Sequence, residues 1–212
     1  LNDLRNEGLK IGTVGKPLTG LTVKIASDGE ILMKGSSVMM GYYKNEEMTQ
    51  NTIINGYLHT GDIGEIDADG FLKITDRKKE MFKTSGGKYI APAVLESALK
   101  QSRFIEQIMI IGESKKMPAA LIQINFEFAK DWATRKKLNP ASILTHERFI
   151  NRIQKEIDFH NQKFGKWEQI KRFELTPDEW SIEAGHLTPT MKMKRKIIKE
   201  KYNYLHQKIY NS

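Results

Sequence analysis

The sequence predicts an α+β fold in which a small β-rich, barrel-like part precedes a compact α+β domain with a short three-stranded sheet and helices. Glycine distribution is the first reason, because 13 of the 16 glycines lie within residues 1–87 and separate short β-rich runs. The second is that apolar residues recur at helical spacing from about residue 90 onward. The third is charge: residues 1–78 carry nine Lys and Arg against eleven Asp and Glu, whereas residues 79–212 carry 25 against 15. We therefore predict two domains, 1–78 and 79–212.

Short strands joined by glycine turns are expected in the first domain, as a small antiparallel sheet or barrel. Strand composition is seen in Leu21–Ala26, Glu30–Lys34 and Phe71–Thr75. Ser27-Asp28-Gly29 and residues 67–70 (DADG) are turn signals, since Asp and Gly accept left-handed backbone. The DADG segment lacks the spaced carboxylates and closing Glu of an EF-hand, which favours a turn over a calcium loop.

Helices alternate with three short strands in the second domain. A helix is predicted over Ala91–Gln101, with Pro92 in its first turn. Further strands are predicted at Ile108–Ile111, Ala119–Ile124 and Ile170–Leu175, and further helices at Asp131–Lys137, His146–Phe159 and Met193–Tyr210.

Composition excludes several classes of protein and site. The 212 residues contain no cysteine, which excludes disulfide scaffolds, Cys-ligated zinc and a thiol nucleophile. The five histidines show no metal-ligand spacing, so we expect no metal site in this chain. There is no apolar run long enough to span a bilayer and no charged-then-apolar leader, so we expect a cytoplasmic fragment of something longer. The net charge of +8, concentrated in the second domain, indicates a polyanionic ligand: nucleic acid, nucleotide or phosphorylated cofactor.

Two charged positions in the first domain are candidates for ligand binding. Asp62 lies between two glycines, and its carboxylate suits a vicinal diol such as that of ribose; alternatively it is a turn residue that holds its own backbone. Arg77, in the run Asp76–Lys79, could reach a ribose or phosphate, unless the run is a solvated linker. This run also coincides with the change in composition, where an interdomain hinge is expected.

Two segments of the second domain are candidates as well. Thr84–Tyr89 contains Gly86 and Gly87, but a phosphate-binding P-loop is excluded because Phe82 replaces the required glycine and Tyr89 follows the lysine. The paired glycines still allow a thin ligand to lie against bare backbone. Lys192 follows a Thr-Pro-Thr turn, and a lysine on such a loop can deliver a charge to a phosphoryl group or can simply be solvated.

In this order and spacing the segments resemble the adenylate-forming superfamily of acyl-CoA synthetases, luciferases and adenylation domains, over essentially the whole chain. The segments that carry the resemblance are Gly12–Pro17, Asp28–Ile31, Gly41–Asn45 with Thr49, Tyr57–Asp62, Asp76–Lys79, Ser85–Lys88, Ala91-Pro92, Glu96 and Leu187–Arg195. KTSGGKYIAPAVLE together with LTPTMKMKRK is most similar to the long-chain fatty acid–CoA ligase branch. Adenylation domains and luciferases more often have Ser-Gly-Lys where this chain has Thr190-Met191-Lys192.

The resemblance implies roles for single residues. Asp62 corresponds to the family's ribose-binding Asp, Arg77 to its ribose-contacting Arg and Lys79 to the hinge between the large and small domains. Gly86 and Gly87 correspond to the loop that lines the CoA pantetheine channel, and Lys192 to the catalytic lysine of the first half-reaction. That reaction converts carboxylate and ATP to acyl-adenylate and pyrophosphate; CoA then attacks to give thioester and AMP.

The resemblance also implies what lies elsewhere. The family's phosphate loop, magnesium segment and acyl pocket precede the matched region, so residues 1–78 are expected to end the large AMP-binding domain and residues 79–212 to form the complete small domain. ATP and CoA are the expected substrates with a fatty acid, Mg²⁺ ligands are expected outside this chain, and the missing N-terminal large domain is the expected partner. The fragment alone is expected to be inactive, and the full-length enzyme is compatible with peripheral membrane association.

Two other functions compete with this interpretation. A ligase for an aryl or shorter acid would share the same segments. A basic nucleic-acid-binding module is suggested by the seven basic residues after Thr188, but no RNP-like aromatic strand or zinc-finger spacing accompanies them, and we expect no nucleic-acid partner.

Overall fold

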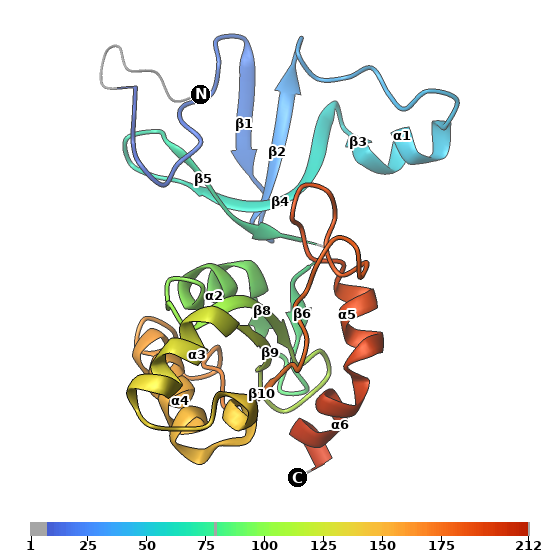
Figure 1. The fold of residues 1–212 in the computed structure, drawn as a ribbon. Helices are drawn as coiled ribbons and strands as arrows, with labels where there is room; N and C mark the ends of the chain where they lie inside the picture. Colours follow the sequence, from blue (N-terminus) through green and yellow to red (C-terminus); the bar gives the residue numbers. More distant parts are fainter. Residues whose placement is uncertain (1–7, 79, 212) are drawn as a thin grey trace. The chain divides into compact units, whose positions relative to one another are not determined.

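The structure is a computed structural model and describes residues 8–78 and 80–211. It divides into two compact units, Leu1–Met81 (unit 1) and Phe82–Ser212 (unit 2), whose elements Figure 1 labels. The domain boundary between residues 78 and 79 stays a prediction, and Lys79 lies outside the described residues.

Unit 1 is built on an antiparallel sheet of five strands: β1 (Leu21–Ile25), β2 (Glu30–Gly35), β3 (Ile53–Ile54), β4 (Tyr57–Ile66) and β5 (Leu72–Arg77). The strand order is β1-β2-β4-β3. Strand β3 pairs with Tyr57 and Leu58 at the start of β4, and β5 pairs with the later part of β4, from Asp62 to Ile66. Within the described residues this sheet is open, which corrects the barrel-like expectation. Closure would require the two edges to pair, and β3 is only two residues long.

A short helix between β2 and β3, α1 (Glu46–Thr52), was not among the predicted elements. Asn45 caps it, because its side-chain oxygen accepts a hydrogen bond from the Met48 N–H at 3.0 Å. Glu46 and Glu47 in the first turn suit the positive end of the helix.

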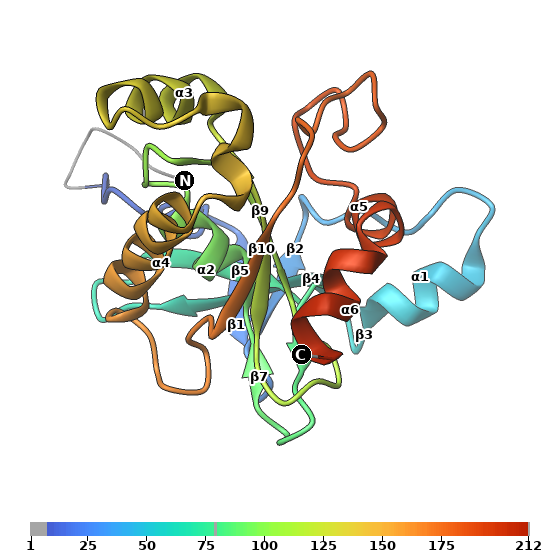
Figure 2. The same ribbon diagram turned by 60° about the horizontal axis from the view of Figure 1, so that its bottom comes forward.

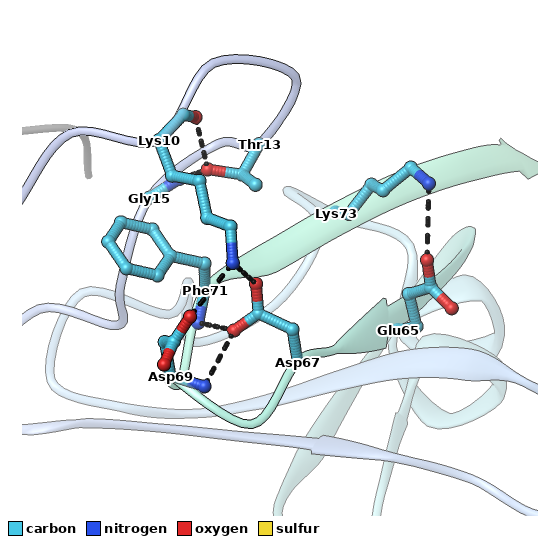
Figure 3. A network of polar contacts seen from close by, with 8 residues as sticks. All are labelled: Lys10, Thr13, Gly15, Glu65, Asp67, Asp69, Phe71 and Lys73. Atoms are coloured by element: carbon cyan, nitrogen blue, oxygen red, sulfur yellow. Dashed lines mark hydrogen bonds and ion pairs between the residues drawn. The ribbon is translucent and has the colours of Figure 1, made fainter.

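The turn between β4 and β5 contains the DADG segment, drawn in Figure 3. Oδ1 of Asp67 accepts hydrogen bonds from the backbone N–H groups of Asp69 and Phe71 at 3.0 and 2.9 Å. Lys10 Nζ lies 2.7 Å from Asp67 Oδ2 and 2.9 Å from Asp69 Oδ2. These carboxylates therefore organise a turn, and the hydrogen bond from Lys10 holds the pKa of Asp67 below its ordinary value. No cluster of three or more potential metal ligands occurs among the residues described.

Unit 2 has a central three-stranded sheet with the order β10-β9-β8. Strand β8 (Ile105–Ile111) runs antiparallel to β9 (Ala119–Ile124), and β10 (Arg172–Leu175) runs parallel to β9. A hairpin of β6 (Phe82–Lys83) and β7 (Tyr89–Ile90) precedes this sheet. The helices are α2 (Pro92–Leu99), α3 (Phe126–Arg135), the 3₁₀-helix η1 (Pro140–Thr145), α4 (Glu147–Asn161), α5 (Arg195–Lys201) and α6 (Asn203–Asn211).

Helices cover both faces of this sheet, as Figure 2 shows with α2–α4 on one side and α5 and α6 on the other. Alternate residues of each strand therefore enter different cores. Ile108 and Ile110 pack with Phe149 and Ile153 in the first core, whereas neighbouring residues of β8 and β9 pack with α5 and α6 in the second. Burial on both faces explains why β9 is apolar apart from Gln123.

Two predicted helices of unit 2 differ from the observed ones by more than two residues at an end or by a break. Helix α3 begins at Phe126 rather than residue 131, because Asn125 caps it by accepting a hydrogen bond from the Phe128 N–H at 2.9 Å. The predicted terminal helix is two helices, α5 and α6, interrupted at Tyr202, whose φ and ψ are −103° and 26°. The Tyr202 ring is buried against Trp180 and His186, so tertiary packing overrides the helical periodicity there. Among the described residues no helix is both long and apolar enough to cross a membrane.

Candidate functional site

Asp62 and Arg77 lie directly opposite each other on β4 and β5. The Arg77 Nε lies 2.7 Å from Asp62 Oδ1, and 60% of the arginine side chain is exposed against 22% of the aspartate. Asp62 is thus not a turn residue that binds its own backbone. Its second carboxylate oxygen makes no hydrogen bond within the described residues. The pair therefore presents an acceptor oxygen beside guanidinium N–H donors. The acceptor suits the hydroxyl groups of a diol, and the donors suit a diol or a phosphate.

A buried carboxylate, Glu30, shapes the strand before Asp62. Its Oε1 accepts the Gly61 N–H at 2.9 Å, and its Oε2 lies 2.9 Å from His59 Nδ1 and 2.8 Å from Lys78 Nζ. Burial raises the pKa of the Glu30 carboxyl, but the hydrogen bonds from Lys78, His59 and Gly61 outweigh it, so the pKa lies below its ordinary value. Glu30 therefore ties together the segments that carry Asp62 and Arg77.

The glycine loop, residues 84–88, connects β6 to β7. Thr84 accepts the Gly87 N–H on its carbonyl at 2.9 Å and donates its own N–H to Lys88, also at 2.9 Å. A Cβ added at Gly86 would meet nothing within 4 Å, whereas Gly87 has a φ of +77°, where other residues are strained. The two glycines thus differ: Gly87 is required by the turn, and Gly86 leaves open backbone.

Lys192 lies in a compact loop, residues 188–192, just before α5. The Thr188 N–H donates to the Lys192 carbonyl at 2.8 Å, and the Lys192 N–H donates to the Thr188 hydroxyl at 3.0 Å. Leu187 and Met193 pair as a short antiparallel bridge at the base of the loop. The Lys192 side chain is exposed, and its Nζ makes no ion pair within the part of the chain that the structure describes. Hydrogen bonds therefore fix the backbone of this loop, and the ammonium group of Lys192 is accessible to a ligand.

The glycine loop and the Lys192 loop lie at opposite ends of unit 2. Ser85, in the glycine loop, lines a groove with Ile209 and Tyr210 at the end of α6. The Lys192 loop instead leads into the first turn of α5. The structure thus brings Asp62 and Arg77 together within unit 1, and separates Gly86 and Gly87 from Lys192 within unit 2.

The sequence of this chain matches a known protein family. Residues 80–212 match the family model described as the AMP-binding enzyme C-terminal domain. The chain belongs to this family. The segments that resembled adenylate-forming enzymes in the sequence therefore lie in a chain of that superfamily.

Similarity to known proteins extends beyond unit 2 to nearly the whole chain. The chain is 42% identical over 207 residues to the long-chain-fatty-acid–CoA ligase FadD15 of Mycobacterium tuberculosis, which covers 96% of this chain and 34% of that protein. It is 34% identical over 219 residues to fatty acyl-CoA synthetase B of Dictyostelium discoideum, covering 95% and 32%. The chain thus spans about a third of the length of these relatives.

Solved structures share the fold of this chain. The adenylation domain of a carboxylate reductase from Mycobacterium chelonae matches with a TM-score of 0.75 at 22% identity, covering 93% of this chain and 32% of that one. The o-succinylbenzoate coenzyme A synthetase of Bacillus subtilis, in complex with AMP, matches with a TM-score of 0.65 at 26% identity, covering 90% and 36%.

Sequence reasoning missed the supporting role of Glu30. The residue appeared as the first position of a predicted strand and within the segment Asp28–Ile31 of the family resemblance, with no role assigned to it. A usable signal was available, because Glu is unfavourable in a strand unless a partner compensates its burial. The role of Arg195 was missed for a different reason, because its partner Glu96 is 99 residues away in the sequence.

Proposed function

We propose that the chain is the C-terminal part of an ATP-dependent long-chain fatty acid–CoA ligase. The full-length enzyme joins a fatty acid to ATP to give acyl-AMP and pyrophosphate, and then transfers the acyl group to CoA with release of AMP. The observation that carries this proposal is the 42% identity to a long-chain-fatty-acid–CoA ligase across 96% of the chain. Names of the relatives also favour a fatty acid over an aryl acid.

Unit 1 contributes nucleotide binding in this proposal. The free oxygen of Asp62 accepts a hydrogen bond from a ribose hydroxyl, and Arg77 donates to the ribose or a phosphate. Their 2.7 Å contact supports the assignment, because each group orients the other before the nucleotide arrives. Mg²⁺ is expected to accompany ATP in the full-length enzyme.

Lys192 supplies the charge for the first half-reaction. A fatty carboxylate and the ATP α-phosphate are both anionic, so they repel each other as they approach. The lysine ammonium stabilises the negative charge that develops between them. Its exposed position on an ordered loop supports this role.

The second half-reaction uses the other end of unit 2. Gly86 offers bare backbone beside which the pantetheine arm of CoA can lie. The glycine loop and the Lys192 loop are at opposite ends of unit 2. A change in the orientation of unit 2 therefore replaces one loop by the other at the active site of the full-length enzyme. Lys79, which we propose as the hinge, precedes unit 2 in the sequence.

Replacement of Lys192 in the full-length enzyme tests the proposal. We expect Lys192→Ala to reduce acyl-adenylate formation by on the order of 10²-fold or more, while thioester formation from supplied acyl-AMP continues. Lys194→Ala is the matched control, since Lys194 is an exposed lysine two residues away. Equal losses in both half-reactions, or equal losses in both variants, contradict the role of Lys192.

A further inference from the structure

An ion pair between Arg195 and Glu96 lies immediately beside the Lys192 loop. Arg195 Nη1 donates to Glu96 Oε1 at 2.8 Å, and Nη2 donates to Oε2 at 2.6 Å. This is a two-pronged contact, which fixes the direction of the guanidinium plane as well as its distance. The Glu96 side chain is 7% exposed and that of Arg195 is 27% exposed, so solvent screens the pair little.

Glu96 connects three parts of unit 2. It belongs to α2, and its Oε1 also accepts the backbone N–H of Ile110 at 2.8 Å. Ile110 belongs to β8, the edge strand of the three-stranded sheet. Helix α2 packs on one face of that sheet and α5 on the other, so the ion pair passes around the sheet edge and joins the two layers.

The Lys192 loop is held at its C-terminal side by this contact. The Lys194 N–H donates to the His186 carbonyl at 2.8 Å, and Arg195 is the next residue. Arg195 is three positions after Lys192, a span of at most about 11 Å. No side chain caps the start of α5, so Arg195 anchors a helix end that has no cap of its own.

We infer that Arg195 and Glu96 are a positioning pair that sets the Lys192 loop for adenylate formation, an inference that rests on the proposed role of Lys192. Neither residue is a catalytic residue: both act through the backbone of the loop. Misplacement of a charged group by about 1 Å can cost on the order of 10²-fold in rate, so a contact of this kind can govern the reaction without touching substrate.

Two conservative variants of the full-length enzyme separate this role from general stability. Arg195→Lys keeps the charge but loses the two-pronged geometry. Glu96→Gln loses the charge but retains an oxygen for the Ile110 N–H. We expect each to reduce kcat for acyl-adenylate formation by about 10-fold or more, with KM for ATP little changed and thioester formation from supplied acyl-AMP preserved. Arg135→Lys is the matched control, because Arg135 pairs with Asp131 on the exposed face of α3.

A double-mutant cycle with Lys192→Ala decides whether the pair acts through the lysine. We expect Arg195→Lys to cause no further loss of adenylate formation in the Lys192→Ala background. Additive losses overturn the inference, as do equal losses in both half-reactions with a lower melting temperature. If Arg195→Lys and Glu96→Gln form adenylate normally while Lys192→Ala does not, the inference alone is overturned. If Lys192→Ala itself forms adenylate normally, the proposed role of Lys192 is overturned and the inference with it.

Discussion

The carboxylate of Glu30 accepts the backbone N–H of Gly61 at 2.9 Å, one residue before Asp62. Gly61 has a φ of +72°, and its carbonyl accepts the N–H of Lys78, the residue after Arg77. A single buried side chain thus fixes the backbone beside both members of the Asp62–Arg77 pair. Loss of Glu30 is therefore expected to disturb the Asp62–Arg77 pair, which we propose as the nucleotide-binding site of unit 1.

Glu30→Gln is expected to lower the free energy of unfolding of the chain by about 1–3 kcal/mol, because Lys78 and His59 lose a charged acceptor. Chemical denaturation at pH 7 measures this loss. Since the pKa of Glu30 is lowered in the folded state, its contribution is present above the unfolded pKa, about 4.3, and disappears as the pH falls through the folded value. Asp28→Asn is the control, because Asp28 contacts the same Lys78 from a half-exposed position. A loss in this control as large as that in Glu30→Gln contradicts the special role of the buried carboxylate.

Asp62→Asn in the full-length enzyme is expected to raise KM for ATP by about 10- to 100-fold, the effect of one charge-assisted hydrogen bond. Steady-state kinetics at varied ATP measures it, with Asp69→Asn as the control because Asp69 contacts Lys10 instead. If the pair is only a surface ion pair, the variant leaves KM unchanged and costs at most about 1 kcal/mol of stability.

Gly86→Leu is expected to block CoA-dependent turnover while sparing adenylate formation. Open space surrounds the Cβ position and Gly86 has no positive φ, so stability should change by less than about 0.5 kcal/mol. Gly87→Ala, by contrast, should cost about 1 kcal/mol, because its φ is +77°. Measurement of melting temperature and both half-reactions separates the two effects. Normal thioester formation by Gly86→Leu rules out the channel assignment.

Met191→Val is expected to destabilise the chain by about 1 kcal/mol or more, and Met191→Gly to leave it as stable or make it more so. The reason is the φ of +61° at Met191, a left-handed conformation that is hardest for a β-branched residue. Met191 is 57% exposed, so lost packing contributes little. Thermal unfolding of both variants is the measurement, and a less stable Met191→Gly chain contradicts the prediction.

His186→Phe is expected to reduce the amount by which stability decreases when the pH is lowered. Burial, followed by the nearby Lys201 charge, lowers the pKa of His186 against smaller opposing effects of Asp178 and the Glu179 backbone. Between the lowered folded pKa of His186 and its unfolded pKa of about 6.5, the folded chain therefore binds fewer protons than the unfolded chain. Stability decreases there as the pH is lowered, by up to about 1.4 kcal/mol per pH unit for this group. Phenylalanine keeps the packing against Tyr202 and cannot be protonated. Melting temperatures between pH 5 and 7.5 measure this slope. Buried His160 and half-buried His206, whose pKa values are also lowered, contribute to the slope in both chains. Identical slopes for both chains exclude His186 as a contributor.

Local signals in the sequence determined the α+β class, the three strands of unit 2 and most of its helices. The apolar run of β9 and the Asp-Gly turns act over a few residues, so their structural effect is visible in the chain itself. Resemblance carried by short segments also placed Asp62, Arg77, Gly86, Gly87 and Lys192 as candidates, although composition and spacing alone left each of them ambiguous.

Tertiary structure alone decided how those candidates are supported. The Asp62–Arg77 contact depends on the register of β4 and β5. The difference between Gly86 and Gly87 depends on the backbone angle φ of Gly87, and the break between α5 and α6 depends on the buried ring of Tyr202. The Arg195–Glu96 pair joins residues 99 positions apart around the edge of a sheet. Contacts of this kind depend on where whole elements pack, and no window of neighbouring residues contains that information.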